Sequence, residues 1–110
     1  MSFDDEERIV DILNFGEELA IYVDLGRREF LRFCGSGRSI ERLTELIGEA
    51  ASHLSIEAKG KFLEINWKGV IGMRQILAHV YGRIDSEILW KTVSKDVPIL
   101  ISTLAIEVKN

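Results

Sequence analysis

The chain has 110 residues, of which 46% are hydrophobic and 29% are charged, and its formal net charge is −4 at pH 7. This balance is typical of one globular domain over residues 1–110 and excludes a disordered segment. No apolar run approaches the ~20 residues of a membrane-spanning helix, and the acidic residues 4–7 differ from a basic and then apolar secretory signal. We therefore expect a cytoplasmic protein that does not contact a membrane.

Apolar residues at helical spacing predict helices along most of the chain. The first should run from about Asp4 to Val23 and end at Leu25-Gly26, followed by a short helical turn over residues 27–33. Gly35-Ser36-Gly37 then breaks the pattern before a second long helix from about Arg38 to Leu54. The apolar stripe of the first helix comprises Ile9, Ile12, Leu13, Leu19, Ala20 and Val23. That of the second comprises Ile40, Leu43, Ile47, Ala50 and Leu54, with Leu46 and Ala51 beside them.

The second half of the chain continues the helical pattern. Residues 55–62 predict one or two helical turns, and residues 67–81 predict a helix that Gly82 closes. Asp85 or Ser86 is expected to cap the last helix. Its apolar residues are Ile88, Leu89, Val93, Leu100, Leu104 and Val108.

Pro98 lies inside this last helical pattern, where it should kink or restart the helix near Asp96, because proline lacks an amide and clashes one turn back. Trp67 and Trp90 are interpreted as core residues, and His53 as a solvated histidine at a helix end. Together the elements predict an all-α, up-and-down bundle of four main helices plus short helical turns.

The cysteine and histidine counts limit the kinds of site that the chain can form. Cys34 is the only cysteine, so an internal disulfide is impossible. With two histidines besides it, His53 and His79, a structural zinc site is not expected, and we predict no other metal and no cofactor.

The acidic net charge argues against broad, charge-driven binding of nucleic acid. Residues 65–84, however, contain no Asp or Glu, while Lys68, Arg74 and Arg83 are present. This segment predicts a local positive field that favours a phosphate at one place. The alternative is that three basic residues in twenty are an ordinary composition.

The helix predicted over residues 67–81 carries the candidate site. On a helical wheel, Arg74 lies in the middle of an apolar cluster formed by Trp67, Val70, Ile71, Ala78 and Tyr81. An arginine at such a position must be paired or must point at an anionic ligand, because burial of its charge alone is costly. His79 lies ~140° away, beside Lys68, Gly72 and Gln75.

Arg74 and His79 therefore do not share a face of a straight helix. The helix can be irregular near Gly72, the long arginine can swing round, or two protomers can pack these helices together. We favour the third arrangement, because Gly69 and Gly72 lack side chains and permit close approach of another backbone. A twofold dimer would then line one cleft with both residue types from both chains.

These residue types suit the cleavage of RNA. A histidine with a pKa near neutral can move the proton of a ribose hydroxyl or of the leaving oxygen. An arginine can hold the scissile phosphate and stabilise the charge of the transition state. The structural alternatives are an Arg74 paired with an acid of a neighbouring helix, a His79 bonded to a carbonyl, and a Tyr81 at the edge of the core.

The motif Arg74-x4-His79-x-Tyr81 resembles the R-x4-H-x-Y signature of the HEPN domains of HepT-like toxins. Residues 41–54 and 65–100 are also similar to the second long helix, the catalytic helix and the final helix of that family. The resemblance implies a HEPN-type helical bundle and a metal-independent endoribonuclease. It also implies a homodimer with its active cleft at the interface.

The resemblance further implies a toxin of a type VII HEPN/MNT toxin–antitoxin system that acts on RNA and not on DNA. Its antitoxin would be an MntA-like nucleotidyltransferase that transfers AMP onto a tyrosine. Carried over, Arg74 and His79 would be catalytic, and Tyr81 would be the site of AMPylation. The supporting residues would be Gln75, Lys68 and Arg83.

Two positions depart from the family pattern. Gln75 stands where the family usually has Asn or Asp, and Val80 stands where Asp is common. A weakened or inactive member is therefore one alternative. Others are a non-catalytic nucleotide-binding or adaptor HEPN subunit of a nucleotidyltransferase complex, and a plain helical dimerisation module.

Overall fold

The computed structural model of the chain describes residues 1–34, 38–77 and 86–109, and in these ranges all regular structure is helical. The helices are α1 (Phe3–Asp24), α2 (Arg27–Phe33), α3 (Arg38–Ser52), α4 (Ile56–Gly60), α5 (Trp67–Leu77) and α6 (Ser86–Lys109). The all-α fold class is confirmed, as are the short helical segments predicted around residues 27–33 and 55–62. None of these helices has both the length and the hydropathy that crossing a bilayer would require.

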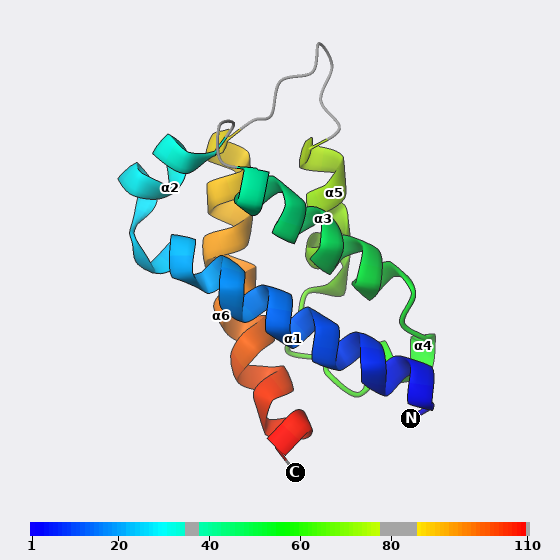
Figure 1. Cartoon of the computed structure of the whole chain (residues 1–110). Helices are drawn as coiled ribbons and strands as arrows, with labels where there is room; N and C mark the ends of the chain where they lie inside the picture. Colours follow the sequence, from blue (N-terminus) through cyan, green and yellow to red (C-terminus); the bar gives the residue numbers. More distant parts are fainter. Residues whose placement is uncertain (35–37, 78–85, 110) are drawn as a thin grey trace.

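The four long helices form a closed arrangement of neighbours. Helix α1 packs on α3 and α6, and α5 packs on α3 and α6 as well. Figure 1 shows α1 and α3 running in opposite directions in front of the antiparallel pair α5 and α6. The short helix α2 packs on α1 and α6. The predicted bundle of four main helices is therefore confirmed.

Helix α1 begins and ends within one residue of the predicted bounds. The Ser2 hydroxyl accepts a hydrogen bond from the backbone N–H of Asp5 at 3.1 Å, which caps the helix. Carboxylates in the first turn lie where the helix dipole favours negative charge. At the other end the chain turns at Gly26, whose φ of 94° is strained for residues with a side chain, and enters α2.

Helix α3 begins at Arg38 as predicted and ends at Ser52, two residues before the expected Leu54. The predicted face is largely confirmed, because Ile40, Leu43, Ile47 and Leu54 are buried. Its centre differs slightly from the prediction, since Ala51 is fully buried while Ala50 is half-buried. The face also includes Thr44, whose hydroxyl donates to the carbonyl of Ile40 at 2.7 Å, and Gly48.

Helix α6 is one uninterrupted helix that contains Pro98, so of the predicted kink or restart near Asp96, the restart is wrong. The pyrrolidine ring is on the exposed side, while the neighbouring apolar residues Val97 and Leu100 are fully buried. Packing of this face outweighs the hydrogen bond that proline removes. Ile88, one of the apolar residues named for this helix, is 48% exposed.

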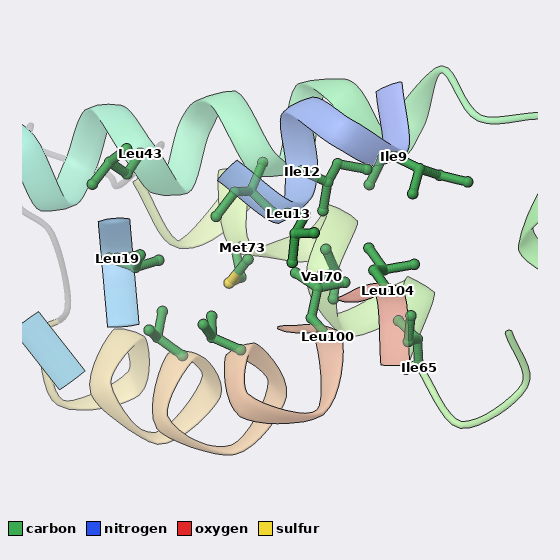
Figure 2. Packing of buried hydrophobic residues seen from close by; sticks show 14 of the residues in the cluster. Ile9, Ile12, Leu13, Leu19, Leu43, Ile65, Val70, Met73, Leu100 and Leu104 are labelled. Atoms are coloured by element: carbon green, nitrogen blue, oxygen red, sulfur yellow. The ribbon is translucent and has the colours of Figure 1, made fainter. Parts of the chain in front are cut away.

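The core gathers side chains from all of the long helices. Figure 2 shows Val70 and Met73 of α5 within the cluster to which α1, α3 and α6 contribute. The predicted α6 residues Leu89, Val93, Leu100 and Leu104 are fully buried. The side chain of Val108 lies outside the described part of the chain.

The two tryptophans lie at the margin of this core. Trp67 and Trp90 are half-buried and pack against it. The indole N–H of Trp67 donates to the carbonyl of Lys59 at 3.0 Å, which fixes the start of α5 against the end of α4. The ring of Trp90 lies 5.1 Å from that of Phe30. Their interpretation as core residues is confirmed in part, since both are half-buried against the core.

Candidate functional site

Arg74 lies at the edge of the buried face of α5. Val70 and Met73 are fully buried and define that face, whereas 37% of the Arg74 side chain is exposed. The prediction that Arg74 occupies the middle of the apolar cluster is therefore wrong, because the helix is rotated so that Met73 takes that place. The guanidinium consequently remains in contact with solvent.

Within one chain, Arg74 is paired with Glu49 of α3. Arg74 Nη1 donates to Glu49 Oε2 at 2.7 Å, across the contact between the two helices. The Glu49 side chain is 55% exposed, so the pair lies at the surface and an anion can approach it from solvent. Of the two expected arrangements, a paired arginine or one that points at an anionic ligand, the structure shows pairing within the chain, with an acid of a neighbouring helix.

Glu49 also contacts a histidine. Its other oxygen, Oε1, lies 2.8 Å from Nε2 of His53, the residue that directly follows α3. The hydrogen bond with His53, followed by the hydrogen bond and the charge of Arg74, lowers the pKa of Glu49. Glu49 is therefore ionised at neutral pH. His53 is exposed near the end of α3, which confirms its interpretation as a solvated histidine.

Gly48 lies directly under the stem of Arg74. A Cβ atom at Gly48 would lie 2.5 Å from Cγ and 3.0 Å from Cδ of Arg74, and 3.4 Å from the carbonyl oxygen of Ile71. No side chain fits in this space without displacing the arginine. The stem of Arg74 therefore crosses α3 at its one residue without a Cβ, and its head reaches the next residue, Glu49.

The two glycines of α5 have different surroundings. A Cβ atom at Gly69 would lie 2.4 Å from Asn66 Nδ2 and 2.9 Å from Asp96 Oδ2, so the close approach at Gly69 is to side chains of its own chain. The absence of a side chain at Gly69 is therefore explained within one chain, without a second protomer. Gly72 has no described atom within 4 Å of such a Cβ, so space beside it is open.

The segment that lacks acidic residues in sequence is not free of them in space. Glu49 approaches it from α3, and Asp96 approaches it from α6. Burial raises the pKa of Asp96, and the charge of Lys95 opposes this rise. The positive field predicted from the sequence is therefore reduced by two carboxyl groups that come from outside the segment.

The remaining predicted site residues are only partly described. Lys68 and Gln75 lie on α5 and are exposed. His79, Tyr81 and Arg83 lie outside the described residues, as do Ala78 and Gly82 of the same predicted helix end. Over the ranges 1–34, 38–77 and 86–109, no group of three or more His, Cys, Asp or Glu side chains is placed to hold a metal ion.

Gly48 and Glu49 are the two contacts of Arg74 that sequence reasoning missed. One signal was present. Gly48 falls on the apolar face of a helical pattern, where glycine weakens the helix and its presence indicates a close approach. The partner of that approach was not deducible from spacing, since Arg74 follows Glu49 by 25 residues.

Comparison with known proteins gives a consistent result. The sequence model of the family described as "Ribonuclease HepT-like" matches residues 12–105. The chain is 34% identical to "Putative RNase MJ1380" of Methanocaldococcus jannaschii, over 82% of this chain and 84% of that protein. It is 39% identical to "Probable ribonuclease HepT" of Thermococcus cleftensis, over 56% of each protein. No solved structure gives a significant match.

Proposed function

Because this chain belongs to the HepT-like ribonuclease family, we propose that it is a metal-independent endoribonuclease whose working groups are Arg74 and His79. The observation that carries the proposal is the position of Arg74. Its guanidinium is held at the surface of α5, where it is partly exposed and paired with an ionised carboxylate. A phosphate of RNA can reach the donors that Glu49 does not use.

The proposed reaction is an attack of the ribose 2′-oxygen on the adjacent phosphorus. The bond from phosphorus to the 5′-oxygen breaks, which leaves a 2′,3′-cyclic phosphate on one fragment and a 5′-hydroxyl on the other. His79 moves a proton from the attacking hydroxyl or to the leaving oxygen. Arg74 donates hydrogen bonds to the non-bridging oxygens and stabilises the added negative charge.

We further propose that the active form is a homodimer with its cleft at the interface. Arg74 and His79 lie about 140° apart on an ideal helix, so a second protomer is the simplest way to bring both residue types into one cleft. The open space beside Gly72 on α5 supports this arrangement, because another backbone can approach there. Lys68 and Gln75, which are exposed on α5, would contact the RNA or the partner.

The toxin role and its control belong to the same proposal. An MntA-like nucleotidyltransferase would transfer AMP onto Tyr81 and release pyrophosphate from ATP. The modification would add bulk and a phosphate charge to the cleft that binds RNA. Tyr81→Phe is then expected to cleave RNA as the wild type does and to escape the antitoxin. Mass spectrometry of Tyr81 after incubation with ATP and the nucleotidyltransferase tests this directly.

Cleavage of RNA in EDTA tests the enzymatic proposal. The wild-type protein is expected to cleave, and His79→Ala is expected to lose on the order of 10²- to 10⁴-fold in rate. Arg42→Ala is a matched control, because Arg42 is an exposed arginine of α3 that pairs with Glu45 and not with Glu49. Loss of cleavage on removal of metal, or cleavage by His79→Ala at the wild-type rate, would contradict the proposal.

A non-catalytic adaptor for a nucleotidyltransferase is the second candidate. The ion pair of Arg74 with Glu49 favours it, because it provides a structural role for the arginine within one chain. In that case neither wild type nor His79→Ala cleaves RNA, while the protein still binds ATP or AMP in complex with the nucleotidyltransferase.

A further inference from the structure

We propose that Gly48 and Glu49 of α3 are positioning residues, which together place the Arg74 guanidinium for a phosphate. The inference rests on the proposed function, since it concerns how the same site binds RNA. It assigns a role to two adjacent residues outside the R-x4-H-x-Y motif. Neither of them is proposed to touch the reacting atoms.

Gly48 sets the path of the Arg74 stem. It lies in the interior of α3 on the buried face, where alanine would be the better helix former. The space that its Cβ would fill is taken by Cγ and Cδ of Arg74, which are the middle of that side chain and not its mobile end. An alanine here would push the whole arginine away from α3, and the backbone carbonyl of Ile71 limits how the helices can adjust.

Glu49 sets the orientation of the Arg74 head. Its Oε2 accepts from Nη1 at 2.7 Å, while its Oε1 is 2.8 Å from His53, so the carboxylate is itself held on both sides. A guanidinium carries five N–H donors in a planar fork. The contact with Glu49 fixes the plane of this fork and leaves donors for two oxygens of a phosphate.

An ordinary surface ion pair would not need this arrangement. Exposed pairs hold long side chains loosely and contribute little to stability. Here Gly48 has no side chain, so the stem of Arg74 can cross the helix. The following residue, Glu49, binds the guanidinium at the end of that stem. The exposed pair formed by Arg42 and Glu45 on the same helix has no such glycine under it.

Steady-state kinetics of RNA cleavage separate positioning from other roles. Glu49→Gln and Gly48→Ala are each expected to lower kcat about 10- to 100-fold, because a displacement near 1 Å can cost that much. KM should change less, and Glu49→Asp should fall between wild type and Glu49→Gln. Glu45→Gln, at an exposed carboxylate of the same helix, is the matched control with wild-type kinetics.

A different outcome would overturn the inference. Wild-type kcat in Glu49→Gln would show that the carboxylate does not position the arginine. A rise in kcat would show that Glu49 competes with the phosphate and acts as a brake. If Glu49→Gln lowers Tm and its loss of kcat is no larger than that loss of folded protein explains, Glu49 has a structural role only.

A thermal double-mutant cycle tests the geometry independently of activity. In an Arg74→Ala background the space over Gly48 is free, so Gly48→Ala should raise Tm by a few degrees through its better helix propensity. In the wild-type background the same change should leave Tm unchanged or lower it. Equal effects in both backgrounds would overturn the role of Gly48. If the wild type cleaves no RNA, the proposed function fails, and this cycle still decides the geometry.

Discussion

Asp5 in the first turn of α1 accepts two hydrogen bonds from Ser55, which begins α4. The backbone N–H of Ser55 donates to Asp5 Oδ1 at 3.0 Å, and its hydroxyl donates to Oδ2 at 2.7 Å. The same hydroxyl accepts from the N–H of Ala58 at 3.0 Å and so caps α4. One serine therefore ends the α3–α4 connection, starts a helix and binds the chain to α1.

Ser55→Ala should destabilise the protein by about 1 kcal/mol or slightly more, because loss of a helix cap costs ~0.5–2 kcal/mol. For a domain of this size the expected fall in Tm is about 4–8 °C per kcal/mol. Ser102→Ala is the control, since that exposed hydroxyl donates to the carbonyl of Ile99 within α6. A Tm equal to the control would contradict the proposed role of Ser55.

The Asp5 carboxylate should make the protein less stable to unfolding as the pH falls into the acid range. Its hydrogen bonds with Ser55, first through the backbone and then through the hydroxyl, lower the pKa of Asp5 in the folded protein. Its contribution is therefore present above the unfolded pKa of about 3.9 and is lost as pH falls through the lower folded pKa. Thermal unfolding of wild type and Asp5→Asn should differ most near neutral pH, and the difference should shrink in strong acid.

Asp96 should have the opposite effect on stability. Asp96 is only 5% exposed, and burial raises its pKa in the folded state. The ionised form is then unfavourable, so stability falls as pH rises from the unfolded pKa through the folded pKa. Asp96→Asn should have a higher Tm than wild type at pH 8 and about the same Tm in acid. A variant that is less stable than wild type at pH 8 would contradict this account of Asp96.

Gly26 and Gly60 should respond to alanine in opposite ways. Among the residues that the structure describes, no atom lies within 4 Å of a new Cβ at either glycine, so sterics do not separate them. Gly26 has φ 94° and ψ 167°, a conformation that is essentially restricted to glycine and costs other residues of order 1–3 kcal/mol. Gly60 lies in α4 with no such strain, so alanine should stabilise by ~0.4–1 kcal/mol. Chemical denaturation of both variants measures this contrast.

Features that depend on neighbouring residues along the chain were predictable. The start of α1 follows from the acidic residues of its first turn and the apolar stripe behind them, and the structure places it within one residue. The start of α3 at Arg38 follows from the Gly35-Ser36-Gly37 break and the apolar stripe after it. Such signals are local, since a cap and a stripe are read within a few residues.

Features that depend on residues far apart in sequence were not predictable. The pairing of Arg74 with Glu49 and the contact of Gly69 with Asp96 arise only when α3 and α6 pack against α5. A small difference between the expected and the observed rotation of α5 about its axis is enough to make Arg74 half-exposed, where the prediction had it buried. His79 and Tyr81 lie outside the described residues, so their predicted roles stay predictions.

Pro98 makes the second half of α6 dependent on the rest of the protein. The carbonyl one turn before it, at Ser94, lacks the backbone donor that another residue at position 98 would supply, so packing of the apolar side of α6 on α1 and α5 supports the helix there. A synthetic peptide covering residues 86–109 should therefore be poorly helical in water. Packing on the neighbouring helices stabilises this segment. The second half of α6 therefore becomes fully helical only when α1 is already in place to pack against it.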